Sequence, residues 1–436
     1  MPERSGPRVT FFGLVAAVMA ALKLKEVWEN YKQVPTEEEG RVALGSPSVY
    51  RDEPEVAGGD VEAISLLNTN IPVTRPKRKR AKCCVCCGLD CGLFWKAFGI
   101  VCALFVLWNT FKLIRWAVTP KPTGLEDMPE YGVSLGCVSA PFIYNGGPVA
   151  FEFPVGTDGA GHSFDTRGGA VGTVTLLEGV PTDTTVKYEV TVRTDSEALL
   201  DKVLLKYPST VTDFIINTPH PAEGECMRYD VKMYIPPNLK KLFVASHTVT
   251  HVRFDSGAYI QLDDLAVILF SPASDNMILP HDNILSHEMA LEVFNGWIVG
   301  DAAVQGTTKL TTQRGQGVLN VRVHPTDPVD PASPDAAILQ TTTGSGRTDI
   351  LYVEHEGHVH RPISSLHMSS MNGPMYLTYR DAQYNGRIAL GSQSFTATGV
   401  RSFAAAAGGT WTHSVGDVNG KDELVIKSKG WTGLYF

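Results

Sequence analysis

The sequence predicts a mainly β protein, in which a stacked β-roll or right-handed β-solenoid-like ectodomain follows one transmembrane helix and a disordered N-terminal tail. Three observations lead to this prediction. One long apolar run occupies residues 93–118. From about residue 130 onward, short runs rich in β-branched residues alternate with turn residues. From residue 285, a strand, a polar turn with glycine and a second strand recur loosely.

Residues 1–82 are predicted to form a cytoplasmic tail that is mostly disordered, because residues 34–60 mix acidic residues with glycine, proline and serine and lack apolar periodicity. A short helix is expected near residues 10–33, where good helix formers follow the apolar run 10–22. That run is shorter than the roughly 20 apolar residues that cross a bilayer. A signal sequence, an amphipathic membrane-associated helix, or neither of these, all stay open for it.

Residues 83–118 are predicted to be a cysteine-rich collar and the transmembrane helix. Trp95, Trp108 and Trp116 suit the two interfacial belts of a bilayer. A buried core helix is the alternative, but it leaves the basic block before the run unexplained. By the positive-inside rule, that block keeps the N-terminus cytoplasmic, which gives a single-pass type II protein with an extracellular or lumenal C-terminal domain, in the plasma membrane or secretory pathway. This topology signal comprises Arg75, Lys77, Arg78, Lys79, Arg80 and Lys82.

The collar cysteines are predicted to be S-palmitoylated, since they are cytoplasmic and adjoin a transmembrane helix. A structural zinc site needs two separated half-sites. Here all five cysteines lie close together and no histidine precedes His162, so zinc is disfavoured. The cysteines are Cys83, Cys84, Cys86, Cys87 and Cys91.

A linker is predicted at residues 119–130 and a β-rich domain at residues 131–436. Short strands cannot bury an apolar face alone, so stacking of successive strand pairs is favoured over a β-sandwich of hairpins. The best helix candidate in this region is residues 196–208. Strands are expected at residues 185–194, 228–236, 241–255 and 265–271. The repeat is marked by turn glycines Gly296, Gly317, Gly346, Gly373 and Gly386.

Cys137 and Cys226 are the cysteines that follow the apolar run. In an oxidising compartment they could pair, and two buried thiols are the alternative. Both states stay open.

We expect no catalytic residue, cofactor or metal. His358 and His360 share a strand face, with His355 nearby, and His247 and His251 form a second pair, but no third ligand is predictable for either. Asp263 and Asp264 are adjacent on a strand and therefore face opposite sides, which does not suit paired catalytic carboxylates. Residues 119–436 carry 22 Lys/Arg against 34 Asp/Glu, so a nucleic-acid partner is excluded.

The stretch "LEVFNGWIVGDAAVQGTTKLTTQRGQGVLNVRV", residues 291–323, resembles the repeats of the adhesin-like β-repeat family. The layout of polar tail, basic cysteine-rich collar, single helix and β region is similar to that of uncharacterised fungal single-pass membrane proteins. The resemblance implies a cell-surface or lumenal domain of stacked β structure, with no catalytic residues to carry over.

These observations predict a membrane protein that displays a non-catalytic β-repeat domain for cell-surface interaction or adhesion. Its expected partners are the membrane and a cell-wall glycan or a surface protein. The alternatives are a membrane-tethered carbohydrate-active β-helix enzyme and an endomembrane interaction scaffold.

Overall fold

The computed structural model divides the chain into two compact units, Met1–Lys121 and Pro122–Phe436. The six basic residues of the topology signal lie outside the described residues, as do Cys83, Cys84 and Cys87 and the side chains of Cys86 and Cys91. The described residues are 11–32, 85–86, 89–118, 123–155, 161–206, 213–353, 359–402 and 410–436.

The first unit contains two helices, α1 (Phe11–Lys32) and α2 (Cys91–Val118), and the two-residue strands β1 (Val85–Cys86) and β2 (Leu89–Asp90), which pair antiparallel. Helix α1 lies where a short helix is expected near residues 10–33. The two helices pack through small apolar side chains, since Val15 of α1 is buried in one cluster with Ala97 and Val101 of α2. This packing buries only one stripe of each helix.

Within α2, Phe94–Arg115 has the length and apolar composition to cross a membrane, and it is the one such helix in the described part of the chain. Trp95 and Trp108 are exposed. The polar side chain of Asn109 donates to the carbonyl oxygen of Phe105, one turn earlier, at 2.8 Å. The side chain's amide therefore has a partner that requires no water.

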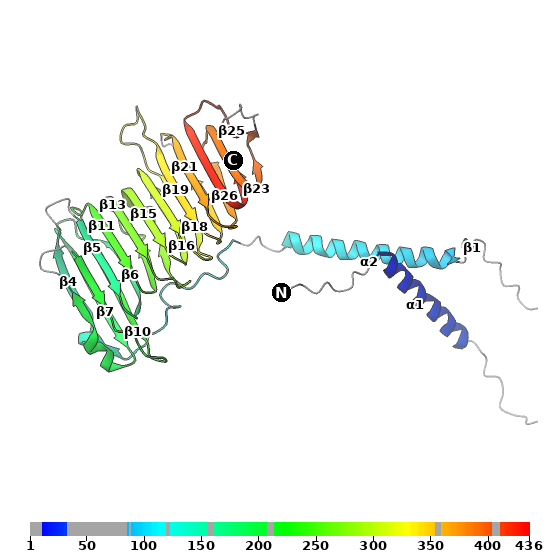
Figure 1. Ribbon diagram of the computed structural model, residues 1–436, viewed down its shortest axis with the longest axis horizontal. Helices are drawn as coiled ribbons and strands as arrows, with labels where there is room; N and C mark the ends of the chain where they lie inside the picture. Colours follow the sequence, from blue (N-terminus) through cyan, green and yellow to red (C-terminus); the bar gives the residue numbers. More distant parts are fainter. Residues whose placement is uncertain are drawn as a thin grey trace, which may run out of the picture. The chain divides into compact units, whose positions relative to one another are not determined.

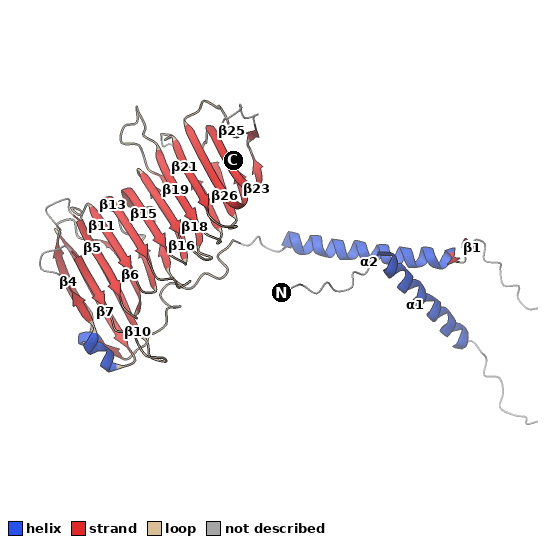
Figure 2. Cartoon of the chain, viewed as in Figure 1, coloured by secondary structure: helices blue, strands red, loops and turns tan. Residues whose placement is uncertain are grey.

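The second unit is built almost entirely of strands (Figure 2). The strands of its first part are β3 (Phe142–Ile143), β4 (Val149–Pro154), β5 (Gly161–Arg167), β6 (Val171–Glu178), β7 (Thr185–Thr194), β8 (Leu204–Lys206), β9 (Asp213–Asn217), β10 (Met227–Ile235), β11 (Lys241–Ser246) and β12 (Thr250–Phe254). They are followed by β13 (Ile260–Leu269), β14 (Met277–Leu279), β15 (Ile284–Val293), β16 (Trp297–Val304), β17 (Thr307–Thr312), β18 (Val318–Pro325), β19 (Ala337–Thr343), β20 (Thr348–Val353), β21 (Ile363–Ser369), β22 (Met375–Asp381), β23 (Gly386–Thr398), β24 (Arg401–Ser402), β25 (His413–Val415) and β26 (Asp422–Tyr435).

From β11 to β22, strands two apart in the sequence pair in parallel, and β5 and β6 pair in parallel with β11 and β12, which produces two series (Figure 1). The first series runs through β5, β11, β13, β15, β17, β19 and β21, and the second through β6, β12, β14, β16, β18, β20 and β22. The long strand β26 pairs with both β21 and β22 and so joins the two series. With the antiparallel strands at both ends, β3–β26 form one large mixed sheet.

The inward side chains of both series form one hydrophobic core. Burial alternates strictly along β7, β19 and β21, as expected for strands with one buried face. One column of stacked residues runs Val267, Leu291, Leu310, Thr341 and His367. Its polar end is satisfied internally, because the Thr341 hydroxyl and the His367 ring hydrogen-bond at 2.8 Å.

Glycines stack at the turn that joins the two series. A Cβ atom on Gly346 would overlap the carbonyl oxygen of Gly317, and one on Gly373 would overlap that of Gly346. The same relation holds between Gly430 and Gly373. These turns therefore approach one another too closely for any other residue. The expected turn glycine Gly386 is different, because it begins β23.

One further expectation about this unit is corrected. Residues 196–208 do not form a helix of that length; a 3₁₀ turn at Glu197–Lys202 is followed by β8. The repeating parallel pairing begins at β5 and β6, well before residue 285. The early strands hide this regularity because β7–β10 interrupt it: β7 runs antiparallel to β10 on one side and to β4 on the other.

Candidate functional site

Residues 123–141, here called the strap, cross the outer face of the second series without joining it as a strand (Figure 1). At one end, the Thr123 carbonyl accepts from Nδ2 of Asn320 in β18 at 3.4 Å. At the other, the Val138 carbonyl accepts from Nη1 of Arg193 in β7 at 2.6 Å. Much of the expected linker 119–130 thus lies on the β unit.

A disulfide between Cys137 and Cys226 attaches the strap to the start of β10, with the two Cα atoms 5.8 Å apart. Of the two states that the sequence leaves open for these cysteines, the structure has the bonded one. Because Cys226 immediately precedes β10, the bond holds the strap beside the outward-facing side chains of that strand.

Arg228 of β10 binds the strap through its guanidinium group. Its side chain is 8 % exposed, and its guanidinium donates to the carbonyl oxygens of Gly132 and of Gly136, the latter at 3.2 Å. The same group donates from Nε to Oδ1 of Asp230 at 2.8 Å, and Asp230 also accepts from the Thr173 hydroxyl at 2.8 Å. A planar cation with five donors suits this task, since one side chain satisfies two backbone carbonyls and a carboxylate.

His251 of β12 is a second anchor of the strap. Its Nδ1 accepts from the backbone N–H of Gly132 at 2.9 Å, and its Nε2 donates to the carbonyl of Asp275 at 2.7 Å. Burial lowers the pKa of His251, which favours the neutral ring that this pair of bonds requires. His251 is thus engaged with the backbone and unavailable as a metal ligand.

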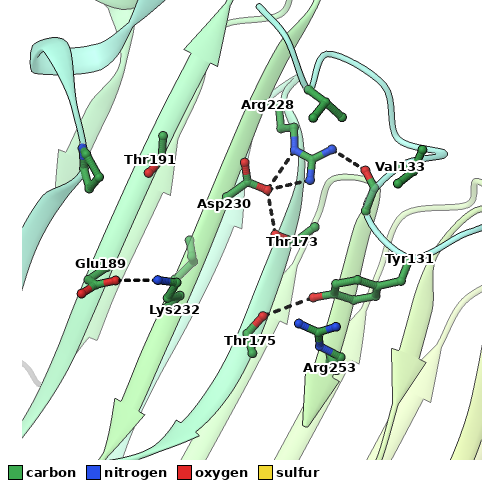
Figure 3. Close-up of a pocket in the computed structure, with 14 residues that line it drawn as sticks. Tyr131, Val133, Thr173, Thr175, Glu189, Thr191, Arg228, Asp230, Lys232 and Arg253 are labelled. Atoms are coloured by element: carbon green, nitrogen blue, oxygen red, sulfur yellow. Dashed lines mark hydrogen bonds and ion pairs between the residues drawn. The ribbon is translucent and has the colours of Figure 1, made fainter. Parts of the chain in front are cut away.

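The strap and the sheet enclose a pocket of about 300 Å³ (Figure 3). Tyr131 forms one wall, with its hydroxyl 3.3 Å from that of Thr175, and the guanidinium of Arg253 lies over its ring at 4.5 Å. Opposite them, Lys232 Nζ donates to Glu189 at 3.0 Å. The outward faces of β6, β7, β10 and β12 supply the floor.

The pocket is more basic than its surroundings. Its lining contains the cations Arg228, Lys232 and Arg253 and the carboxylates Glu189 and Asp230. Each carboxylate is paired with one of the first two cations. Among the described residues no carboxylate lies within ion-pair distance of Arg253, which is exposed. The pocket therefore presents one cation that is free to bind an anion.

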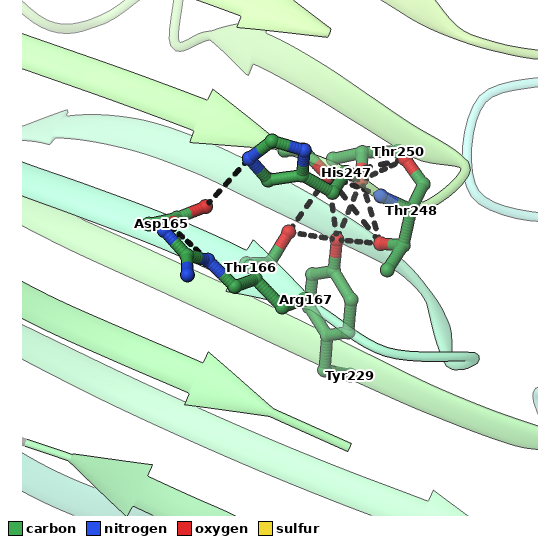
Figure 4. Close-up of polar contacts among 8 residues, drawn as sticks. Asp165, Thr166, Arg167, Tyr229, His247, Thr248 and Thr250 are labelled. Atoms are coloured by element: carbon green, nitrogen blue, oxygen red, sulfur yellow. Dashed lines mark hydrogen bonds and ion pairs between the residues drawn. The ribbon is translucent and has the colours of Figure 1, made fainter. Parts of the chain in front are cut away.

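A second polar cluster lies between β5, β10, β11 and β12 (Figure 4). The Tyr229 hydroxyl lies 3.0 Å from that of Thr166, 2.9 Å from that of Thr248 and 2.5 Å from that of Thr250. All four side chains are buried. The cluster is closed to ligands, and we interpret it as a satisfied polar network within the core.

His247, beside this cluster, does not join His251 in a site. Its ring stacks on Phe270 at 4.8 Å, and its Nε2 lies 3.7 Å from Oδ1 of Asp165. His360 hydrogen-bonds Asp422 at 3.2 Å. His355 and His358 lie outside the described residues. Among the residues that the structure describes, no group of three or more potential ligands could hold a metal ion.

Asp263 and Asp264 form a β-bulge. Both backbone N–H groups donate to the carbonyl of Lys240, at 2.7 and 3.1 Å, and both side chains are exposed. The expectation that they face opposite sides is therefore wrong, because a bulge interrupts the alternation of the strand.

The pocket residues were not identified from the sequence. A usable pattern was present in "MRYDVK", where Arg228, Asp230 and Lys232 alternate along a strand and so share one face. A cysteine directly before this strand indicated that another segment could be bonded there. The identity of that segment depends on contacts between distant residues, such as Gly132 and His251.

No protein-family model matches the chain, and no curated protein matches it. Among solved structures, the chain is similar to a "putative cell adhesion protein" from Clostridium sporogenes, at 10% identity over 66% of this chain and 98% of that one, with a TM-score of 0.20. A "putative adhesin" from Parabacteroides distasonis matches at 11% identity over 67% and 98%, with a TM-score of 0.33. One from Parabacteroides merdae matches at 9% identity over 66% and 97%, with a TM-score of 0.29. Scores this low establish neither a shared overall fold nor a shared ligand.

Proposed function

We propose that this chain is a single-pass type II membrane protein that displays a non-catalytic β domain outside the cytoplasm for surface interaction or adhesion. The strap pocket is the place where that domain binds its partner. The observation that carries this proposal is the unpaired cation Arg253 in a partly enclosed pocket of an otherwise acidic domain.

The topology is supported by α2 and by the charges that flank it. Phe94–Arg115 is long enough to span a bilayer, and the basic block stands on its N-terminal side. The disulfide between Cys137 and Cys226 fits a β domain in an oxidising compartment, which is the compartment that this orientation gives it.

The proposal includes the architecture of the second unit, in which successive strand pairs stack into a β-roll or a right-handed β-solenoid. Parallel pairing between strands two apart is the pattern that successive strand pairs produce when each pair stacks on the one before. The glycines aligned at Gly317, Gly346 and Gly373 support this arrangement, because each turn rests on its predecessor. We call each such strand pair a rung.

A binding role is favoured over an enzymatic one by how the pocket's carboxylates are held. Asp230 accepts from Arg228 and Thr173, and Glu189 accepts from Lys232. A catalytic acid or base must have a carboxylate oxygen within reach of the reacting group, and both carboxylates here already accept hydrogen bonds from side chains of the pocket. The two carboxylates therefore serve to hold the cations in place.

The proposal is tested with the full chain on the surface of cells. Protease added to intact cells should release fragments of residues 123–436, and substitution of the six basic residues of the topology signal by glutamine should abolish this release. Cells that carry Arg253→Glu should adhere poorly to the partner surface. The matched control is Arg380→Glu, because Arg380 is also exposed and lies over a tyrosine ring, that of Tyr435, at 5.9 Å. A β unit protected in intact cells would contradict the topology.

A further inference from the structure

We propose that the strap pocket binds a single carboxylate-bearing sugar at the end of an otherwise neutral glycan. This inference rests on the proposed function, and it adds the chemical class of the ligand.

The charge of the ligand follows from Arg253. Its guanidinium is exposed and lies over the Tyr131 ring, so cation–π attraction holds the cation in position before a ligand arrives. A guanidinium forms two parallel hydrogen bonds to one carboxylate, and such charge-assisted pairs are stronger than neutral ones. The neighbouring cations are already occupied, because Arg228 binds Asp230 and Lys232 binds Glu189. The pocket therefore has room for about one negative charge.

A polyanion does not fit the charges of the pocket and of the domain around it. Residues 119–436 carry 12 more acidic than basic residues, and Glu189 and Asp230 lie in the pocket lining itself. Repeated phosphates or uronates would meet these carboxylates as well as Arg253. A neutral chain with one terminal acid keeps the favourable contact and avoids the repulsion.

The remaining lining suits a molecule that carries hydroxyl groups. Thr173, Thr175 and Thr191 point their hydroxyl-bearing side chains from β6 and β7 toward the pocket (Figure 3). The pair of Lys232 and Glu189 offers a donor and an acceptor side by side, and both side chains are about half exposed. The Thr173 and Thr175 hydroxyls already contact Asp230 and Tyr131, which leaves Thr191 and the pair of Lys232 and Glu189 for a ligand. A sugar ring presents several groups that both donate and accept, so it can contact these remaining partners together.

The size of the pocket limits the ligand to about one ring. A volume of about 300 Å³ lies at the lower end of the range for small-molecule sites. The strap forms one wall, and the side toward solvent leaves an exit for the rest of the glycan. One acidic ring would therefore be enclosed while the neutral part stays outside.

The test uses the full chain in lipid nanodiscs and pairs of oligosaccharides that differ only in charge. Each pair has one terminal sugar acid, glucuronate, galacturonate or sialate, as the free acid and as its methyl ester. We expect the acid of at least one pair to bind at least tenfold more tightly than its ester. Arg253→Ala should remove this preference, Arg253→Lys should keep part of it, and Arg380→Ala should leave it unchanged.

The inference is overturned if acid and ester of every pair bind alike, if Arg253→Ala keeps the preference, or if a polyuronate binds better than the single acid. In each of these cases the proposed function stands if cells still adhere through the pocket. If neither adhesion nor any glycan binding depends on Arg253, both proposals fail. Acetate that competes as well as the oligosaccharide would show that the sugar ring contributes nothing, and this also overturns the inference.

Discussion

Strands β3–β12 and strands β13–β22 contribute side chains to one hydrophobic core, but they differ in how neighbouring strands connect. In the later set, each strand pairs in parallel with the strand two positions on. In the earlier set, β7 inserts as an antiparallel strand, and the strap and its disulfide lie over the result. The three hollows described at this unit, of about 240 to 340 Å³, all involve the earlier strands.

Under the proposed function, β13–β22 act as a scaffold and the earlier strands, with the strap, carry the binding site. Repeated parallel rungs place equivalent residues beside one another, so their surface is even and their turns are tightly stacked. An inserted strand and an overlying segment break that regularity and leave a concave surface with charged walls. The residues of the candidate site thus lie where the repeat is interrupted, as is common for binding loops held on a rigid framework.

The largest effect is expected in the regular rungs, from Gly346→Ala. The new Cβ would overlap the carbonyl oxygen of Gly317, so the turns would have to separate. We expect a loss of about 4 kcal/mol or more in the free energy of unfolding, or no folded protein. Denaturant unfolding measures this. Gly147→Ala is the control, because Gly147 has open space around its Cβ position; similar losses for both variants would contradict the stacked turns.

The next largest effect is expected at the earlier strands, where the disulfide bonds the strap to β10. Replacing both Cys137 and Cys226 by serine removes a crosslink between residues 89 apart in sequence, for which loop entropy gives about 4–5 kcal/mol as an upper estimate. Because the strap forms no strand, the loss should show mainly as faster proteolysis near residues 130–141. Uniformly faster cleavage throughout β13–β22 would indicate that the two regions are not separable.

A third prediction uses pH and one buried histidine in each region. Burial lowers the pKa of His162, in β5, to about 4 and that of His367, in β21, to about 3. The unfolded chain binds these protons near pH 6.5, so each histidine contributes stability above that pH and the contribution is lost as the pH falls toward the folded value. Between pH 6.5 and 4.5 the loss is roughly 2–3 kcal/mol for each histidine.

The measurement is the change in melting temperature across this pH range in the wild type and in His162→Gln and His367→Gln. Each substitution should flatten the profile by a similar amount, whichever region it lies in. Profiles as steep as that of the wild type would show that these rings accept protons in the folded state.

The smallest expected effect is that of Tyr131→Phe. The variant loses a 3.3 Å contact between hydroxyl groups at the pocket wall but keeps the ring beneath Arg253. We expect the free energy of unfolding to fall by about 0.5–1 kcal/mol, with little change in the affinity for an acidic ligand. Calorimetric titration with the glycan acids checks this, and a loss of binding as large as that of Arg253→Ala would mean that the hydroxyl itself contacts the ligand.

Much of the regular part could be predicted from the sequence. The alternation in residues 185–194 coincides with β7, and the turn glycines Gly317, Gly346 and Gly373 do stack. The helix predicted at residues 196–208 was wrong, since this segment forms a 3₁₀ turn and β8. The pairing of β8 with β9 outweighed the helix preference of the individual residues. Gly430 was missed because it lies inside β26, away from the repeat.

The site could not be predicted in the same way, since its parts are far apart in the sequence. Tyr131 and Arg253 meet only because the strap lies across β12, and no local pattern encodes that path. The alternating charges of β10 indicated a polar face. Only the fold shows that the strap covers part of this face and leaves Arg253 unpaired.

The most direct test is hydrogen–deuterium exchange of the full chain in nanodiscs, with and without a neutral oligosaccharide that ends in the sugar acid that binds most tightly. If the strap pocket is the site and the regular strands β13–β22 are the scaffold, the ligand should slow exchange at strap amides such as that of Gly132, and along β10 and β12. Exchange in β15–β22 should stay unchanged. Slowing confined to β15–β22, or found nowhere in the β unit, would contradict the account.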